Sequence, residues 1–411
     1  MSEEPIKTDL RSVVYALSDA LDLVGIDDVA HGKRVGIMAA LCGKAMGWEE
    51  AEQSFMFDLG MLHDIGVSST QTHQHLLLEF DWEDSWKHAV RGYELLKDFQ
   101  PLARMAVPIR YHHTRWDKLG PLIPQTLSAQ QADEANLIFL VDRVDTFAAP
   151  YYGGNLFDHI DAIRERVRGV AGSYFSPRLV DAFIGASQAE AFWLMLEPQA
   201  IQHYLVGQQA RHDPQSMSYE ELRQLARIFA QIVDAKSQFT HAHSLGVTTL
   251  AGYLAAKMGV SAEGQAKLEI AGLLHDLGKL RIPDEVLDKP GKLDAHERQI
   301  MNTHSFQTYE ILVNIPGFED IAQLAAYHHE IPDGSGYPFH LHGDSLSLEA
   351  RILRVADVFQ AMAQNRPYRA GLSADQIKVF LEELGQQGKL DPDIVAAVTA
   401  DMPAAMQAAS N

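Results

Sequence analysis

The chain has 411 residues, 46% of them apolar, with 34 lysines and arginines against 55 aspartates and glutamates. This length predicts two or three domains with sizeable cores. The formal charge of −21 argues against binding to long nucleic acid or to anionic membranes. It does not exclude a small anionic ligand, because bound metal ions can reverse the local field.

Secretion and membrane insertion are also disfavoured. Cys42 is the only cysteine, so no intrachain disulfide can form, and its apolar helical context predicts a buried residue. The N-terminus MSEEPIKTDL lacks the cationic start and apolar core of a signal peptide. No apolar run approaches the ~20 residues that span a bilayer. We therefore expect a cytoplasmic protein that does not associate with membranes.

From the N-terminus onward, apolar residues recur at the spacings of three and four that are typical of helices. SWKHAVRGYELLKDF, residues 85–99, shows this pattern in the first half, and SAEGQAKLEIAGLLHDL, residues 261–277, shows it in the second. Ser261 is a candidate N-cap for the latter helix, and Gly278 follows it. Strand-like alternation is scarce, so we predict an all-α fold.

The histidines reveal an internal repeat. Two sets of residues stand in register, namely His31, His63, Asp64, His88, His112, His113 and Asp142, and His243, His275, Asp276, His304, His328, His329 and Asp357. The first two histidines of each set are 32 residues apart, and the third and fourth are 24 apart. Flanking residues agree, since GMLHDIG matches GLLHDLG. We predict two tandem helical modules, residues 1–200 and 215–411, with the junction near 197–218.

Five histidines and two aspartates in one module predict a metal site rather than isolated core histidines. His275 and Asp276 are about 100° apart on one helix, so both can face a common edge. His328 and His329 end another helix, which Pro332 stops. Nitrogen and oxygen ligands without thiolate suit iron or manganese, with zinc as an alternative.

Seven ligands exceed the needs of one ion, so we predict two ions that share Asp276, whose two oxygens can each face one ion. Two neighbouring ions suit hydrolysis of a phosphate ester, in which a bridging hydroxide attacks phosphorus in line.

HDLGK at 275–279 and HHEIPDGSGYP at 328–338, followed by RILRVADVF and NRPYR, resemble the HD-GYP subgroup of the HD phosphohydrolase superfamily. The resemblance is close over 236–370 and looser over the rest of the second module. It implies two HD-type helical bundles, with the HD-GYP catalytic domain at 215–411. It also implies a bacterial phosphodiesterase that uses iron or manganese to open cyclic di-GMP or 3′,3′-cyclic GMP-AMP.

The same resemblance implies that the second set of histidines and aspartates holds the ions. Lys279 would lie beside the scissile phosphate, as charge stabiliser or as proton donor to the leaving ribose oxygen. Gly336, Tyr337 and Pro338 would bring backbone close to the substrate, and Tyr337 would pack the loop or touch a base. Arg366 would contact a phosphate or a guanine edge, or serve a surface role.

The second module departs from the family pattern at three positions. Phe239 stands four residues before His243, where some members have a glutamate that helps to bind a third metal. Gln360 and Thr308 replace an aspartate and a glycine. We therefore expect two ions and an effect on efficiency rather than a different reaction.

The first module keeps the first set of candidate ligands but not the catalytic residues. Val67 replaces the lysine, Thr114 replaces the glutamate, and HHTRWDKLGPL lacks Tyr-Pro. We interpret residues 1–200 as a degenerate HD-like module that can still hold metal. Three roles stay open, namely a structural metal site, a regulatory nucleotide site and a second enzyme with altered specificity.

Two other functions compete with the phosphodiesterase. A non-catalytic signalling receptor or scaffold is disfavoured by Lys279 and the GYP loop. An HD hydrolase of linear nucleotides is disfavoured by the same loop and by the absence of a GxxxxGK[ST] phosphate cradle. The preferred cyclic dinucleotide, the final product (linear dinucleotide or mononucleotides), the metal and the assembly state, with a homodimer among the options, stay open at this point.

Overall fold

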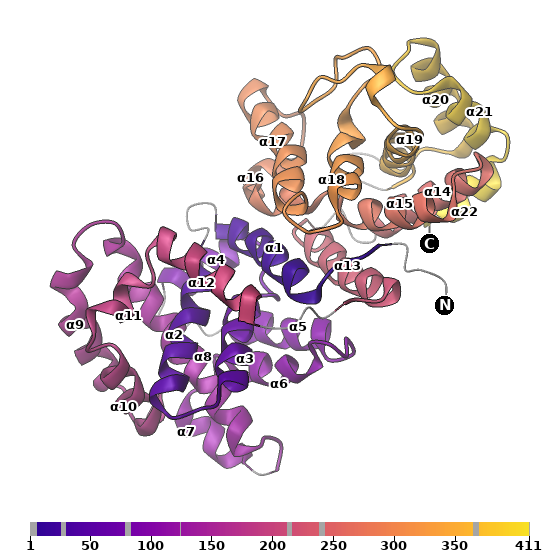
Figure 1. Cartoon of the computed structure of the whole chain (residues 1–411). Helices are drawn as coiled ribbons and strands as arrows, with labels where there is room; N and C mark the ends of the chain where they lie inside the picture. The colour runs from indigo at the N-terminus through magenta and orange to yellow at the C-terminus, as the bar shows by residue number, and fades with distance from the viewer. Residues whose placement is uncertain are drawn as a thin grey trace. The chain divides into compact units, whose positions relative to one another are not determined.

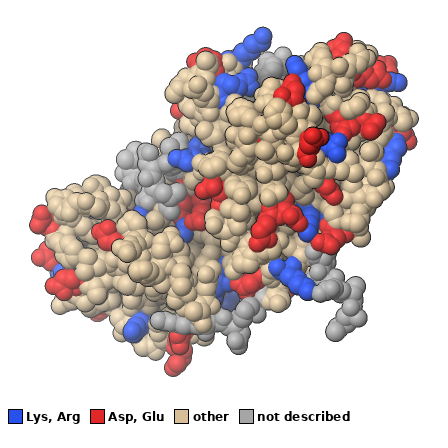
Figure 2. Space-filling view, turned by 45° about the horizontal axis from the view of Figure 1, so that its top comes forward, with Lys and Arg blue, Asp and Glu red and all other residues tan. Residues whose placement is uncertain are grey.

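The computed structural model describes residues 6–25, 30–78, 84–123, 125–211, 216–237, 243–364 and 370–410. Every regular element in these residues is a helix, and β-pairing within them is limited to isolated bridges (Figure 1). The prediction of an all-α fold is confirmed. None of the described helices is long and apolar enough to cross a membrane. Figure 2 shows acidic and basic side chains interspersed on one face, in keeping with the net charge of −21.

The chain folds into two compact units. The C-terminal unit contains Met1–Ile26, Ser68–Thr70 and Gln215–Asn411, and the N-terminal unit contains Asp27–Val67 and Gln71–Pro214. These units differ from the predicted modules in the placement of the first helix, which the repeat assigns to the N-terminal half.

The N-terminal unit is built around α2, α3 and α8. Gly36 of α2 and Gly60 of α3 let the two backbones touch, because a Cβ on Gly60 would lie 2.4 Å from the Gly36 Cα. α8 packs against α2 and α6. The helices are α2 (His31–Ala45), α3 (Glu50–Leu62), α4 (Thr70–Leu78), α5 (Trp86–Leu96), α6 (Ala103–Tyr111), α7 (Trp116–Leu119), α8 (Ala129–Ala148), α9 (Leu156–Arg168), α10 (Pro177–Ala186), α11 (Glu190–Leu194) and α12 (Pro198–Arg211), with short 3₁₀ turns η2 (Gly120–Leu122) and η3 (Ala149–Tyr151).

The C-terminal unit is built around α14, which packs against α15, α19 and α22. Ser261 caps α15 as predicted, since its side chain accepts from the Gly264 N–H. The helices are α1 (Leu10–Asp22), η1 (Leu23–Gly25), α13 (Tyr219–Asp234), α14 (His243–Lys257), α15 (Ala262–Leu274), η4 (Leu277–Arg281), α16 (Asp284–Leu287), α17 (Ala295–Leu312), α18 (Glu319–Ala326), η5 (Tyr327–His329), η6 (Gly343–Ser345), α19 (Leu348–Ala363), α20 (Ala374–Gln386), α21 (Pro392–Thr399) and α22 (Met402–Ser410).

The first helix completes the C-terminal unit. α1 buries Val13, Leu17 and Ala20, and it lies against α17 and η4. The short turn η1 also packs on η4. The approach to α1 is held by a hydrogen bond from the Met217 N–H to the Thr8 carbonyl, at 3.1 Å. The N-terminal segment therefore supports two elements of the C-terminal unit, α17 and η4, that carry predicted site residues.

Candidate metal centre and active site

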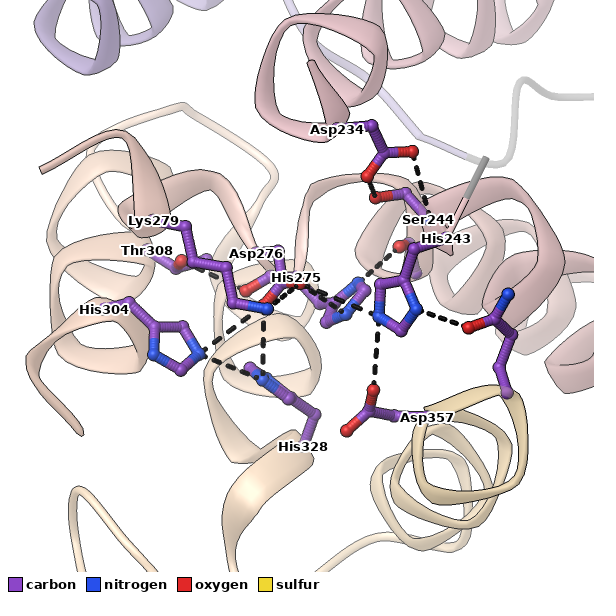
Figure 3. Close-up of polar contacts among 12 residues, drawn as sticks. Asp234, His243, Ser244, His275, Asp276, Lys279, His304, Thr308, His328 and Asp357 are labelled. Carbon is purple, nitrogen blue, oxygen red and sulfur yellow. Dashed lines mark hydrogen bonds and ion pairs between the residues drawn. The ribbon is translucent and has the colours of Figure 1, made fainter. Parts of the chain in front are cut away.

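The second set of histidines and aspartates converges in the C-terminal unit from five different parts of the chain (Figure 3). His243 opens α14, His275 and Asp276 follow α15, and His304 lies within α17. The remaining three come from η5 and α19, namely His328, His329 and Asp357. All are buried except His329, which is partly exposed.

Asp276 stands between two groups of histidines. Its Oδ1 lies 3.5 Å from His304 Nε2 and 3.8 Å from His328 Nε2. Its Oδ2 lies 3.4 Å from His275 Nε2 and 3.7 Å from His243 Nε2. These spacings suit ligands around an ion, because nitrogens about 2.1 Å from one metal lie roughly 3.0–3.5 Å apart.

Asp357 faces both groups from the opposite side. Its Oδ1 is 3.3 Å from His243 Nε2, and its Oδ2 is 4.0 Å from His329 Nδ1. The two aspartates together link the two histidine groups, an arrangement that can hold two ions close together.

Local hydrogen bonds orient three of the imidazoles. The Nδ1 atoms of His275, His304 and His328 each donate to the carbonyl three residues earlier, at 2.7, 2.7 and 2.6 Å. A carbonyl can only accept, so Nδ1 carries the proton and the Nε2 lone pair faces the centre. Within the described residues, His275 Nε2 and Asp276 Oδ1 are buried without a hydrogen-bond partner. Such orphaned atoms fit metal ligands.

The charge states also suit metal binding. Burial lowers the pKa of His304 to about 4, and it holds the pKa values of His328 and His329 well below their usual range. Burial opposes ionisation of Asp276, but the charges of His275 and Lys279 outweigh it and keep the pKa of Asp276 well below normal. Neutral imidazoles and ionised carboxylates are the forms that bind metal.

Lys279 extends from η4 and forms an ion pair with Asp276. Its side chain is 18% exposed, whereas that of Asp276 is 3% exposed. The turn that carries it is tied to α17, because the Thr308 hydroxyl accepts from the Gly278 N–H at 2.9 Å and donates to the His275 carbonyl at 3.1 Å. Thr308, noted in the sequence only as a departure, thus holds the HD turn.

The GYP loop is held by a residue to which the sequence assigned no role. Glu330 is fully buried, and its carboxylate accepts from the N–H groups of Phe339 and Leu341, at 2.6 and 2.9 Å. Gly336 is required by space, since a Cβ there would lie 2.2 Å from the backbone nitrogen of residue 331. The position of Glu330 directly after the histidine pair was the available signal.

Tyr337 packs on the metal-site histidines. Its ring centroid lies 4.8 Å from that of His329 and 6.4 Å from that of His304, and a cis peptide bond joins it to Pro338. Arg366 lies outside the described residues.

Arg354 went unnoticed in the sequence, although it stands one helical turn before Asp357 on α19. It donates to the His328 carbonyl at 3.4 Å.

The N-terminal unit contains a second cluster of the same design. Asp64 Oδ1 lies 3.2 Å from His88 Nε2 and 3.7 Å from His112 Nε2, and Asp64 Oδ2 lies 3.6 Å from His63 Nε2. His31 Nε2 lies 3.5 Å from Asp142 Oδ1. Donor atoms of Asp64, the His112–His113 pair and His88 all lie within 4.8 Å of one another. The structure therefore brings the first set together as well.

The two clusters differ in their cations. Val67 is buried where the other unit has Lys279. Arg143 is buried instead, and it donates to Asp142 Oδ2 at 2.8 Å and to the Leu76 carbonyl at 2.8 Å. This guanidinium is committed to protein groups, so the N-terminal cluster lacks the exposed ammonium of the other unit.

Family models for the HD domain match residues 29–146 and 227–394. The 3′3′-cGAMP-specific phosphodiesterase 1 of Vibrio cholerae is 37% identical over 393 residues, which cover 94% of this chain and 90% of that protein. The chain belongs to the HD-GYP family of HD phosphohydrolases.

Other HD-GYP relatives match less of the chain. The cyclic di-GMP phosphodiesterase response regulator RpfG of Xanthomonas campestris is 39% identical over 44% of this chain and 48% of its own length. The crystal structure of the cyclic GMP-AMP specific phosphodiesterase V-cGAP3 of V. cholerae superposes with a TM-score of 0.65 at 24% identity, covering 98% of both chains. This likeness shows a shared fold for the tandem HD-GYP architecture.

Proposed function

We propose that this HD-GYP protein is a metal-dependent phosphodiesterase that opens a cyclic dinucleotide, with 215–411 as its catalytic domain. The observation that carries the proposal is the placement of Asp276, which divides its two oxygens between two histidine groups while it pairs with Lys279. The cGAMP-specific relative that aligns with most of the chain makes 3′,3′-cyclic GMP-AMP the first substrate to test and cyclic di-GMP the second.

Two divalent ions, iron or manganese, are the cofactors that this ligand set fits, and their chemistry there is to acidify water and neutralise phosphate charge. The chain's own residues prepare the site. The hydrogen bonds on Nδ1 keep three imidazoles aimed at the centre. Lys279 offers a cation to the phosphate, as charge stabiliser or as proton donor to the leaving ribose oxygen. Gly336, Tyr337 and Pro338 form the loop wall that the substrate meets.

We further propose that residues 1–200 form a degenerate HD-like module that holds metal without turnover. The ligand set of this module is complete, and His63 Nε2 and Asp64 Oδ1 are buried without hydrogen-bond partners within the described residues. Arg143 and Val67 replace the exposed cation that catalysis needs. The same proposal places the enzyme in the cytoplasm and takes a homodimer as the assembly to be tested by light scattering.

The test is hydrolysis of cyclic di-GMP, 3′,3′-cyclic GMP-AMP and linear nucleotides by iron- or manganese-loaded protein, with products resolved by chromatography. We expect wild type to cut a cyclic dinucleotide and His275→Ala/Asp276→Ala to leave it intact. Lys279→Met should keep its metal and lose about 10²–10⁴-fold in kcat. His63→Ala/Asp64→Ala is the matched control and should retain turnover. Wild type that leaves both cyclic substrates intact would end the proposal.

A further inference from the structure

His243 is oriented differently from the other metal-site histidines that use Nε2. It is the first residue of α14, so its helix offers no carbonyl one turn back. Its Nδ1 instead lies 2.5 Å from Gln360 Oε1, on α19 (Figure 3). Both side chains are buried, with 2% and 5% exposure. The amide oxygen can only accept, so this bond places the proton on Nδ1 and directs Nε2 toward the two aspartates.

The N-terminal unit uses a carboxylate at the same position. Asp145 stands three residues after Asp142, as Gln360 stands three after Asp357. Asp145 Oδ2 lies 2.8 Å from His31 Nδ1, and His31 is likewise the first residue of its helix. The two centres therefore orient their first histidine in the same way but with acceptors of different charge.

Neighbouring residues match each acceptor. Asp145 Oδ1 accepts from Arg34 Nε at 2.7 Å and from the Tyr152 hydroxyl at 2.6 Å, so the buried carboxylate is compensated. Gly246 stands where Arg34 does, three residues after the first histidine. A Cβ on Gly246 would lie 3.1 Å from the amide nitrogen of Gln360 and 2.5 Å from a carbonyl of α22. Glycine admits the amide, and a neutral acceptor needs no guanidinium.

We propose that Gln360 is a positioning residue that fixes the metal-facing tautomer of His243 through a neutral acceptor, so that this side of the centre holds its ion less tightly than a carboxylate would. A carboxylate partner shifts electron density onto the imidazole and strengthens its bond to metal, whereas an amide does so less. The inference rests on the metal centre of the proposed function, and it gives the glutamine in place of the family's aspartate a physical consequence.

The test compares Gln360→Glu, which keeps an acceptor and adds charge, with Gln360→Leu, which removes the acceptor. Both are made in full-length protein carrying His63→Ala/Asp64→Ala, so that manganese reports on the C-terminal centre. Manganese affinity is measured by electron paramagnetic resonance, and release by transfer to a chelator. We expect glutamate to bind one ion more tightly and leucine to bind it about 10–100-fold more weakly than glutamine. Exposed Gln323→Leu is the matched control and should change neither value.

Equal affinity in the leucine variant and the parent would overturn the inference. If the leucine variant does not fold, the glutamate variant decides alone, and an affinity no higher than that of the parent overturns it. Neither readout needs turnover. Protein that binds manganese in the expected order but leaves cyclic dinucleotides intact would keep this inference and end the proposed function. Active protein indifferent to residue 360 would do the reverse.

Discussion

His31 shows how one hydrogen bond sets the chemistry of a metal ligand. Burial by itself would lower its pKa, but the hydrogen bond and charge of Asp145 outweigh burial and raise the pKa to about 9. His31 is therefore protonated at pH 7, whereas His304 of the other centre, with a pKa of about 4, is neutral. A metal that enters the N-terminal centre must displace a proton from His31.

We therefore predict that metal binding to the N-terminal centre strengthens as pH rises from 7 to about 9, by roughly tenfold per pH unit for one displaced proton. Manganese titrations of His275→Ala/Asp276→Ala protein across this range measure it. Asp145→Asn removes the charge that raises the pKa of His31 and should flatten the slope. The same slope in both proteins would contradict this account.

The linkage to stability has the opposite direction. Because its folded-state pKa lies above the unfolded value of about 6.5, protonated His31 stabilises the metal-free N-terminal unit below that pH. This contribution is lost as pH rises from about 6.5 through about 9. Metal-free protein should thus become less stable over the pH range in which it binds metal better.

At the scale of elements, the GYP loop depends on a single carboxylate. The two backbone N–H groups that Glu330 accepts come from residues 339 and 341, after the Gly-Tyr-Pro turn. The loop therefore closes back on its own start, which keeps Tyr337 against His329.

Glu330→Gln should loosen this loop, because the amide NH₂ would face a backbone donor and leave it unpaired. The expected cost is about 1–3 kcal/mol, seen as faster limited proteolysis between residues 331 and 342 and a lower kcat with retained metal. Glu383→Gln, an exposed change on α20, is the control. Unchanged cleavage and turnover in the Glu330 variant would show that the loop is held by other contacts.

At the scale of the whole molecule, the two compact units do not follow the order of the chain. α1 comes first in the sequence but belongs to the C-terminal unit, where it supports η4 and α17. A fragment that begins at residue 215 would therefore lack part of the core beneath Lys279 and His304.

Leu17→Ala should accordingly destabilise the C-terminal unit, although residue 17 lies in the first half of the chain. Leu17 is 1% exposed, and such truncations cost about 2–5 kcal/mol. Hydrogen exchange by mass spectrometry should show loss of protection in α17 and η4. Leu59→Ala in α3 is the matched control, since Leu59 is 0% exposed and its loss should appear in the N-terminal unit. Exchange changes confined to α2 and α3 in the Leu17 variant would refute this assignment.

The sequence by itself determined what depends on local pattern and residue type. Helical periodicity predicted the all-α fold, the histidine register predicted two modules, and the HD and GYP motifs predicted the family. The two oxygens of Asp276 also foretold a shared ligand, because that follows from the chemistry of one side chain.

Only the tertiary structure decided the contacts between distant segments. The bond from His243 to Gln360 spans 117 residues, the acceptance of α1 by the C-terminal core spans most of the chain, and the capture of Asp142 by Arg143 depends on how α8 packs. Periodicity tells which face of a helix is apolar but not which core receives it. Spacing tells which side chains can bind metal but not which neighbours set their protons and charges.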